Sequence, residues 1–407
     1  MPAHVEEAIP AADNSLAAIA RRRWEALKAG DVGILPIIVG LALIVAFFRW
    51  KNENFDDPGN FTNLMTQMAG VTTIAIGVVF VLLLGEIDLS IAYVSGVAGV
   101  IVAELQVPDG SWEVKGVFAI AVAVGLTALI GALQGSFVAL IGIPSFVVTL
   151  AGLLFWQGVI LYQIGETGVI IIEDSTINNV ANYFFSDRAG LLIAGGATAL
   201  YALATLAGVW SRRRHGIRTD NLVLVLAKLA VFAAVIFGAV VYANKERGFP
   251  LAFLLVIVFL VFWTWVAERT TFGRHVYAVG GNAEAARRAG INVRRIRVQV
   301  FMISGLMAGF GGVIFAARLN SVDLNAGGGT LLLDAISAAV IGGTSLFGGR
   351  GRVISALMGA LVISTVGNGI DLLGYSSAIK YMVTGAILLA AVTLDTVSRR
   401  RLERAGR

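Results

Sequence analysis

Residues 61–105, FTNLMTQMAGVTTIAIGVVFVLLLGEIDLSIAYVSGVAGVIVAEL, contain one apolar run at 62–84 and a second at 89–105. Only the polar break from Gly85 to Ser90 separates the two runs. About 20 apolar residues in a helix are enough to cross the hydrocarbon core of a bilayer. The first run therefore predicts a membrane span, and the short interval after it predicts that some segments are half-helices or re-entrant.

The rest of the chain continues this pattern. Of its 407 residues, 57% are hydrophobic and 14% are charged, whereas a soluble domain has roughly a quarter charged residues. Further apolar runs lie at 33–49, 117–139, 144–165, 190–210, 222–243, 250–267, 298–317, 331–347, 351–373 and 376–395. The sequence thus predicts an all-α polytopic membrane protein with about 10–12 transmembrane helices. A membrane barrel would need alternating strands of about ten residues, which the sequence lacks.

Basic residues gather in the loops on one side of these predicted spans, although the formal net charge is only +5. Cytoplasmic loops of membrane proteins are enriched in Lys and Arg. The basic clusters are Arg21–Arg23, Arg212–Arg214 with Arg218, the loop 268–297, Arg350 with Arg352, and Arg399–Arg401. They predict that both termini are cytoplasmic. They flank spans rather than forming one soluble face, which argues against nucleic-acid binding.

These spans and loops predict a domain order. The predicted parts are a cytoplasmic tail at 1–32, a transmembrane domain at 33–396 and a basic cytoplasmic tail at 397–407. Within the transmembrane domain, the parts are a first half at 33–165, an inserted helix pair at 190–243 and a second half at 250–396.

Two pairs of segments suggest that the halves arose by internal duplication. LLGEIDLSIAYVSGVAGV (83–100) parallels VIGGTSLFGGRGRVISALMGAL (340–361), and residues 131–152 parallel residues 365–386. Paired halves with interrupted hydrophobic segments are typical of transporters, and the interruptions point to the substrate route. Chance is the competing explanation, because glycine-rich apolar sequences resemble one another easily.

The loop 268–297 is the polar exception to this apolar chain, and it contains a short helix with its own start and stop signals. An N-cap residue, an acidic first turn, a basic last turn and a C′ glycine follow one another as capping rules require. These residues are Asn282, Glu284, Arg287, Arg288 and Gly290. A capped helix with no apolar face of its own, attached to a membrane domain, predicts a docking element for another protein.

Polar residues within or beside the spans are candidates for a translocation path, because such residues are costly in a membrane unless they have a partner or face water. The candidates are Asp88, Ser90, Gln134, Ser145, Thr149, Gln157, Thr344, Ser345, Asn368 and Asp371. For a single Ser or Thr, the competing interpretation is a hydrogen bond within the helix bundle. Asp371 and Lys380 lie nearer helix ends, and two further alternatives for them are to snorkel or to pair at the outer surface. For Glu86 and Asp88 the open alternatives are the path, contact with a partner, and a solvated turn.

Several chemistries are excluded by what the sequence lacks. It contains no cysteine, its three histidines lie far apart, and no G-x-x-x-x-G-K-[ST] motif occurs. Such a motif would be needed to hold nucleotide phosphates in a P-loop. We therefore expect no catalytic residues, no metal site and no cofactor on this chain. A driving ATPase would have to be another polypeptide.

Four motifs carry a resemblance to a known family. They are GEIDLS (85–90), IPSFVVTLAG (143–152), TTFGRHVYAVGGNAEAARRAGINV (270–293) and AVIGGTSLFGGRG (339–351). In this order they resemble the permeases of bacterial ABC importers for monosaccharides, of the ribose, arabinose, galactose and xylose type. The resemblance covers roughly 60–165 and 250–396, and the length and the insertion are most similar to the xylose branch.

The resemblance implies a permease homodimer among the lipids of a bacterial cytoplasmic membrane. It also implies two partners, a cytoplasmic ABC ATPase that binds ATP and Mg, and an extracytoplasmic sugar-binding protein. The implied ATPase-coupling helix consists of Asn282, Glu284, Ala285, Ala286, Arg287, Arg288 and Gly290. The family often has glycine where this chain has Glu86, which weakens a functional role for that residue.

Other functions remain open at this point. A permease of the same superfamily could carry nucleosides, autoinducer-like furanones or branched-chain amino acids. An ion-coupled secondary transporter would need an ion site that the spans do not offer. A scaffold protein would not need broken, repeated spans.

Overall fold

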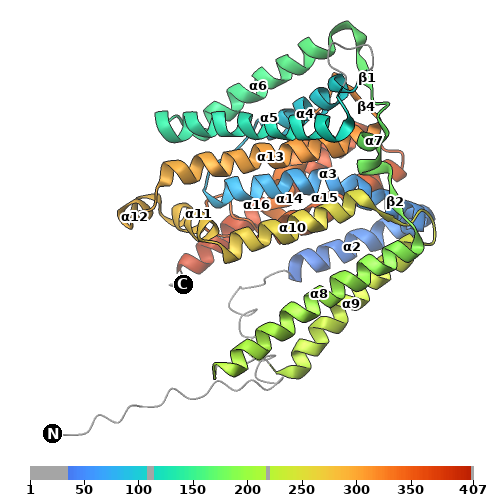
Figure 1. The fold of residues 1–407 in the computed structure, drawn as a ribbon, viewed down its shortest axis with the longest axis vertical. Coiled ribbons are helices and arrows are strands. Elements are labelled where there is room, and N and C mark those ends of the chain that lie inside the picture. Colours follow the sequence, from blue (N-terminus) through green and yellow to red (C-terminus); the bar gives the residue numbers. More distant parts are fainter. Residues whose placement is uncertain (1–34, 108–113, 217–220, 405–407) are drawn as a thin grey trace, which may run out of the picture. The chain divides into compact units, whose positions relative to one another are not determined.

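The computed structural model describes residues 35–107, 114–216 and 221–404, and these are almost entirely helical (Figure 1). The helices that correspond to the predicted runs are α2 (Leu35–Lys51), α3 (Pro58–Leu83), α4 (Ile91–Leu105), α5 (Gly116–Ser136), α6 (Ser145–Ile164), α8 (Asp187–Arg214), α9 (Leu222–Ala243), α10 (Leu251–Arg269), α13 (Val293–Leu319), α14 (Leu331–Ile341), α15 (Ile354–Leu372) and α16 (Ser377–Arg404). Every predicted run thus forms a helix, and the all-α polytopic fold is confirmed. The predicted tail at 1–32, with Arg21–Arg23, lies outside the described residues, as do Arg218 and residues 405–407.

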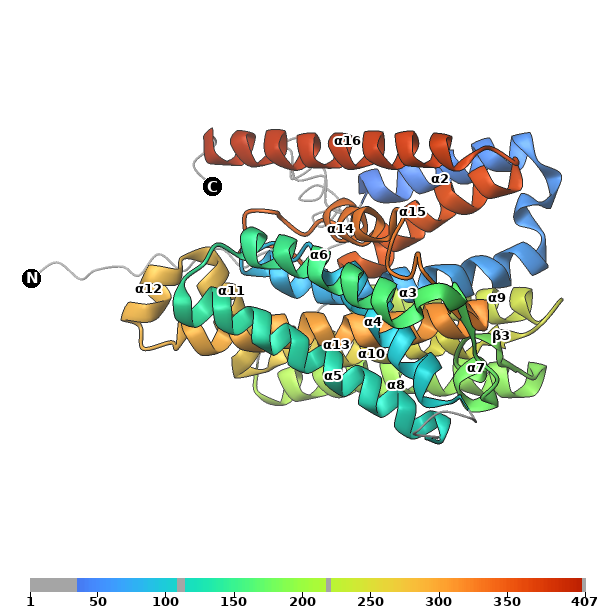
Figure 2. The same cartoon turned by 90° about the horizontal axis from the view of Figure 1, so that it is seen from above.

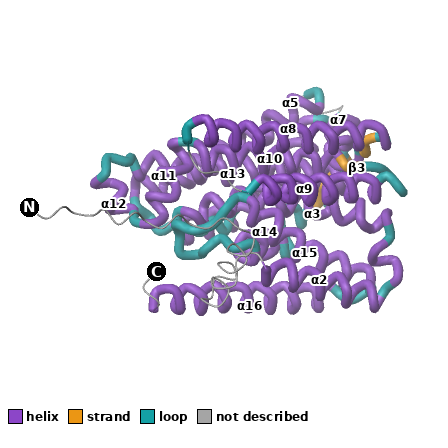
Figure 3. Tube along the Cα trace, turned by 90° about the horizontal axis from the view of Figure 1, so that it is seen from below, coloured by secondary structure: helices purple, strands orange, loops and turns teal. Residues whose placement is uncertain are grey.

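Shorter elements connect these helices. They are the 3-10 turns Glu53–Asp56 and Gly165–Thr167, a π-turn at Phe137–Ile141, the helices α7 (Ser175–Asn182), α11 (Thr271–Gly281) and α12 (Ala283–Arg288), and the strands β1 (Val169–Ile171), β2 (Phe184–Phe185), β3 (Phe249–Pro250) and β4 (Ser321–Asp323). The tube view in Figure 3 shows how little strand and loop lies between the helices.

Eight of the helices are long and apolar enough to cross a membrane. The helices α4 and α14 are shorter, at 15 and 11 residues, so the predicted half-length segments are present. The run predicted at 331–347 was too long, because α14 ends at Ile341. Gly343 follows with φ of 102°, a conformation that glycine adopts without strain and that cannot continue a helix.

Two compact units are formed by the described residues. The first comprises Asp187–Tyr242, where α8 and α9 pair, with the rings of Tyr201 and Phe232 4.3 Å apart. The second, larger unit comprises the described residues within 35–186 and 243–404. The strands β2 and β3 pair antiparallel just before α8 and just after α9, so the chain leaves the second unit and returns to it at one place. The first unit lies within the predicted insertion 190–243 apart from its first residues, and the domain boundaries themselves stay a prediction.

The helix α3 is the hub of the larger unit. In its most apolar window, 94% of the residues are buried, and it packs against α10, α13, α14 and α15. An apolar helix in a membrane can face lipid or protein, and α3 faces protein on all sides. Against α13 lies α5, where a Cβ on Gly131 or Gly305 would overlap backbone of the opposite helix. Small residues on both helices therefore allow their backbones to approach closely.

The packing repeats within the larger unit. Helix α4 packs among α5, α6 and α13, while α14 packs among α15, α16 and α3. The order α3–α4–α5–α6 thus corresponds to α13–α14–α15–α16, which supports the duplication and agrees with the pairing of residues 131–152 and 365–386. The pairing of residues 83–100 with 340–361 is wrong, because by this order the counterpart of the break after α3 is the stretch 320–330 after α13. Similar glycine-rich composition produced that mismatch.

The loops of this unit gather at two ends. At one, which we call the strand end, β1 pairs antiparallel with β4, joining residues 169–171 to 321–323. At the other, the α12 end, lie α11, α12 and the breaks 84–90 and 342–353. Figure 2 shows α12 and the strand β3 at opposite ends of the helices.

Candidate functional site

At the α12 end, the predicted capped helix is present. The side chain of Asn282 accepts a hydrogen bond from the backbone N–H of Ala285, and Gly290 follows the helix with φ of 84°. The backbone N–H of Ile291 donates to Ala286 O, which closes the helix in the manner of a Schellman motif. The start and stop signals in the sequence were therefore read correctly.

The outward face of α12 is charged and accessible. Glu284 pairs with Arg287 at 3.2 Å and with Arg288 at 3.4 Å, and all three side chains are more than half exposed. Such exposed pairs stabilise a helix by only about 0.3–0.5 kcal/mol, so they can be exchanged for contacts with a partner. Among the predicted coupling residues, Ala286 is the one that is not exposed. It is buried in the apolar core and fastens α12 to the bundle.

The helix α11, which precedes α12, rests on a junction of glycines. A Cβ on Gly280 would overlap Leu83 O at the end of α3, and the N–H of Gly349 donates to that same oxygen at 2.9 Å. Gly85 and Gly348 meet here too, both with positive φ. The junction therefore brings α11 into contact with both broken segments, the one after α3 and the one after α14.

Two side chains strengthen this junction. The hydroxyl of Tyr277 donates to Gly351 O at 2.9 Å, and Arg352 pairs with Glu268 at 2.8 Å. Burial and the charge of Glu268 raise the pKa of the Tyr277 phenol above its usual value of 10, against the lowering effect of Arg352. A displacement of α11 would thus be felt directly by residues 342–353.

The acidic break after α3 is tied to α13. Glu86 lies 3.1 Å from Arg297 Nε. Asp88 is buried and accepts hydrogen bonds from Ser90 N, from Ser90 Oγ at 2.7 Å and from Ser304 Oγ at 2.7 Å. Neither acid forms a solvated turn, and both join the first half of the chain to the second.

Three predicted path residues satisfy polar groups near this break. Ser145 Oγ accepts from Ile87 N and Thr149 Oγ1 donates to Ile87 O, each at 3.2 Å. Gln134 Oε1 lies 2.9 Å from Ser90 Oγ. Irregular backbone in a membrane protein needs such partners in place of water, so these contacts are structural in the conformation described.

The second glycine-rich break is a tight turn. The N–H of Ser345 donates to Arg350 O, and Ser345 Oγ accepts from Phe347 N. Thr344 is buried, and its hydroxyl has no hydrogen-bond partner among the described residues.

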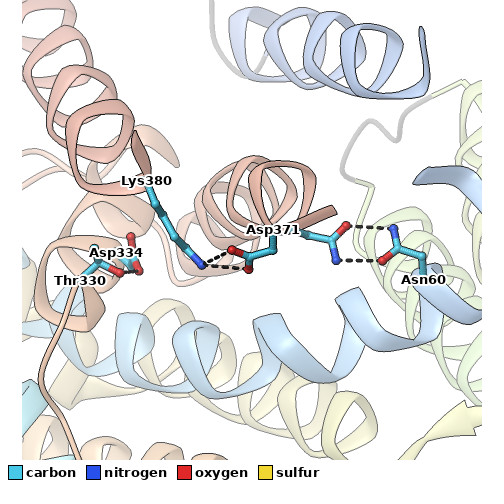
Figure 4. A network of polar contacts seen from close by, with 6 residues as sticks. Asn60, Thr330, Asp334, Asp371 and Lys380 are labelled. Atoms are coloured by element: carbon cyan, nitrogen blue, oxygen red, sulfur yellow. Dashed lines mark hydrogen bonds and ion pairs between the residues drawn. The ribbon is translucent and has the colours of Figure 1, made fainter. Parts of the chain in front are cut away.

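The remaining path candidates lie elsewhere. Asn368 exchanges two hydrogen bonds with Asn60 of α3, at 2.8 and 2.9 Å, and Asp371 pairs with Lys380 at 3.0 Å (Figure 4). Of the alternatives that the sequence left open for Asp371 and Lys380, the structure shows the pairing of the two residues. Gln157 is half-buried, with no side-chain hydrogen bond to a described residue.

A cavity of about 390 Å³ lies toward the strand end, between α3, α4, α13, α14, α15 and α16. This volume is within the range of about 300–1,000 Å³ that is typical of small-molecule sites. Its polar lining includes Gln67, Ser95, Arg318, Asp323, Asn325, Thr330, Asp334, Ser364 and Lys380. None of the ten predicted path residues lines it, and their role in a path stays a prediction.

The sequence held signals for two of the missed lining residues. Asp334 lies inside the run predicted at 331–347, and Arg318 directly follows the run at 298–317. An ionisable residue inside a membrane span is a functional candidate by default. No group of three or more His, Cys, Asp or Glu suited to a metal is found in the part of the chain that the structure describes.

A buried hub helix, half-length segments and a polar cavity define a polytopic membrane transport protein. The family model for the permease component of branched-chain amino acid transport systems matches residues 60–392. The chain therefore belongs to this family of transport permeases, whose members are transport subunits rather than enzymes.

Individual relatives match over most of their length. The xylose transport system permease protein XylH of Escherichia coli K12 is 36% identical over 381 residues, which cover 93% of this chain and 95% of the relative. XylH of Haemophilus influenzae is 34% identical over 377 residues, covering 92% and 99%. The ribose import permease protein RbsC of Escherichia coli K12 is 31% identical over 359 residues, covering 88% and 92%. No solved structure matches the chain.

Proposed function

We propose that this chain is the permease subunit of an ATP-driven ABC importer that carries xylose, or a closely related pentose, across a bacterial cytoplasmic membrane. The observation that carries the proposal is the similarity of nearly the whole chain to two xylose permeases, at 36% and 34% identity. The similarity to a ribose permease supports the sugar class. A branched-chain amino acid, named in the family description, is the alternative cargo.

The proposed mechanism assigns a different task to each end of the molecule. At the α12 end, which we place in the cytoplasm with both termini, an ATPase subunit with ATP and Mg would dock on the exposed charges of α12. Its movement would pass through α11 and the glycine junction to the breaks after α3 and α14. At the strand end, a sugar-binding protein would deliver the monosaccharide to a permease homodimer, which exposes its polar route to each side alternately.

Reconstitution tests this proposal. The purified permease, its cognate ATPase and its binding protein would be placed in liposomes, and uptake of labelled xylose, ribose, galactose and leucine would be measured with and without ATP. We expect ATP-dependent uptake of xylose and weaker uptake of the other sugars. Uptake of leucine alone, or xylose uptake in liposomes without the ATPase, would overturn the proposal.

The coupling role of α12 has its own test, the double reversal Glu284→Arg with Arg288→Glu. The pair of opposite charges is kept, while its order against the helix dipole is inverted at a cost of about 0.3–1 kcal/mol. We therefore expect the variant to insert normally but to lose co-purification of the ATPase and to uncouple uptake from ATP hydrolysis.

A matched control is Glu166→Arg with Arg247→Glu, two exposed residues at the strand end. We expect this control to retain the ATPase on purification. Normal sugar-stimulated ATP hydrolysis and normal uptake in the α12 variant would refute the coupling assignment.

A further inference from the structure

We infer that the strand-end cavity is a transient binding site for the transported monosaccharide within a single permease chain, and that Arg318 and Asp334 contact its hydroxyl groups. This inference rests on the proposed function and adds to it a location and two residues. It assigns the sugar to the space between the two repeated halves, where none of the sequence-predicted path residues lies.

The first observation concerns Arg318. Its side chain lines the cavity and is half-buried in the last turn of α13, yet no described residue forms a hydrogen bond or ion pair with its guanidinium group. A guanidinium group presents five N–H donors in a fixed fork. The charge of Asp371 acts on this guanidinium group without a direct contact. Donors that lie in a cavity wall without a hydrogen-bond partner are suited to a ligand rich in oxygen.

The second observation concerns Asp334, which lies in the first turn of α14. Thr330 Oγ1 donates to Asp334 Oδ2 at 2.6 Å, which fixes the carboxylate, while no described residue donates to Oδ1. The hydrogen bond to Oδ2 thus orients the carboxylate, and Oδ1 can accept a hydrogen bond from a hydroxyl group of the sugar. Figure 4 shows Thr330 and Asp334 beside Lys380, whose ammonium group is directed to Asp371.

That pairing matters because it removes Lys380 from the charge balance of the wall, which leaves one guanidinium group, that of Arg318, with two carboxylates, Asp323 and Asp334. With Lys380 held by Asp371, the nearest cation does not neutralise Asp334 through a direct contact. The cavity also contains neutral polar groups, and Oε1 of Gln67 is buried without a hydrogen-bond partner among the described residues. A neutral polyol satisfies donors and acceptors of both kinds, whereas an anion would meet two carboxylates, Asp323 and Asp334.

Each residue also has a simpler explanation. Arg318 is near a helix C-terminus and Asp334 near a helix N-terminus, where such charges interact favourably with the helix dipole. That explanation accounts for the sign of each charge. It does not account for the two side chains lining the same cavity with unused hydrogen-bonding groups, which is the observation that the inference uses.

The experiment compares variants in the reconstituted importer, with xylose uptake measured at a series of concentrations of sugar-loaded binding protein. Arg318→Gln and Asp334→Asn keep the size of each side chain. We expect each to lower the maximal uptake rate about tenfold or more, as the loss of a hydrogen bond to a charged group would. Thr330→Val, which removes the group that orients Asp334, should give a smaller loss.

Two further measurements separate recognition from folding. Arg212→Gln, the same substitution on an exposed arginine of α8, should leave uptake within about twofold of the unmodified protein, a range typical of neutral surface changes. Arg318→Lys restores the positive charge for the dipole but not the forked donors, so we expect no recovery of uptake. Full recovery by Arg318→Lys would mean that only the charge matters, and the inferred sugar contact would be wrong.

The outcomes distinguish the inference from the proposed function. If the unmodified importer carries no monosaccharide, the proposed function fails. If it carries xylose and the cavity variants do so at the normal rate while they remain folded by size-exclusion chromatography, the site assignment alone fails. If leucine is carried and Arg318→Gln abolishes that uptake, the cavity holds a zwitterion, and both proposals are overturned.

Discussion

Several buried polar residues in this permease are held by specific partners, and Asp88 is one of them. Its carboxylate accepts from both the backbone and the hydroxyl of Ser90 and from Ser304 on α13. A buried charge without such donors would cost several kcal/mol. The residue therefore joins the break after α3 in the first half to α13 in the second half, and its role in the conformation described is structural.

Tyr277 supports a prediction at the same scale. Its hydroxyl donates to Gly351 O, and Tyr277→Phe would leave that carbonyl without its donor. We expect the variant to lose about 1 kcal/mol of unfolding free energy near pH 8. Because burial and Glu268 raise the pKa of the phenol, the native state keeps a proton that the unfolded state has lost above pH 10.

The stabilisation by Tyr277 is therefore complete below pH 10 and decreases as pH rises from 10 through the raised pKa. The difference between the unmodified protein and the Tyr277→Phe variant should narrow over that interval. Denaturant unfolding in detergent, followed by tryptophan fluorescence, measures it. Tyr162→Phe, at a tyrosine that is 87% exposed, is the control and should change nothing. A difference that is constant up to pH 12 would contradict the assignment.

At the scale of elements, α11 connects α12 to the broken segments after α3 and α14, and two adjacent glycines test this connection. A Cβ on Gly280 would overlap Leu83 O and lie 2.9 Å from Gly349 N, whereas a Cβ on Gly281 would have nothing within 4 Å. Gly280→Ala should therefore push α11 off the end of α3, lower the unfolding free energy by about 1–3 kcal/mol and reduce coupled uptake.

Gly281→Ala is a matched control, one residue away in the same helix. We expect it to be neutral or to stabilise by up to about 1 kcal/mol, because alanine favours a helix more than glycine does. Thermal unfolding and sugar-stimulated ATP hydrolysis would be measured for both. Equal behaviour of the two variants would show that the close contact at Gly280 is not needed for coupling.

The elements also show what the sequence could predict. Apolar length located the helices that correspond to the predicted runs, and capping residues located α12, because both signals are local. The helices α7 and α11 were not predicted, because they lie in polar segments between the runs. The cavity could not be predicted in this way, since its lining comes from six helices whose facing sides depend on packing. The prediction that residues 83–100 correspond to residues 340–361 failed because this correspondence also depends on packing. Glycine-rich breaks look alike in sequence, and only the contacts of α4 and α14 show which segments correspond.

At the scale of the whole molecule, charge differs between the two ends. Arg287, Arg288, Arg350 and Arg352 belong to the α12 end, whereas Glu173 and Asp323 belong to the strand end. Cytoplasmic loops are the ones enriched in arginine. This difference in charge supports the proposed orientation, in which α12 faces the cytoplasm and the strands face the outside.

This orientation can be measured because the chain contains no cysteine. Single cysteines would be introduced by Ala289→Cys at the α12 end and Glu173→Cys at the strand end, both exposed positions. In spheroplasts, a membrane-impermeant maleimide should label the strand-end cysteine only. In inverted vesicles it should label the α12-end cysteine only, and permeabilisation should allow both to react. The unmodified protein sets the background, and labelling of the α12-end cysteine in intact spheroplasts would place the ATPase-docking helix on the wrong side of the membrane for coupling.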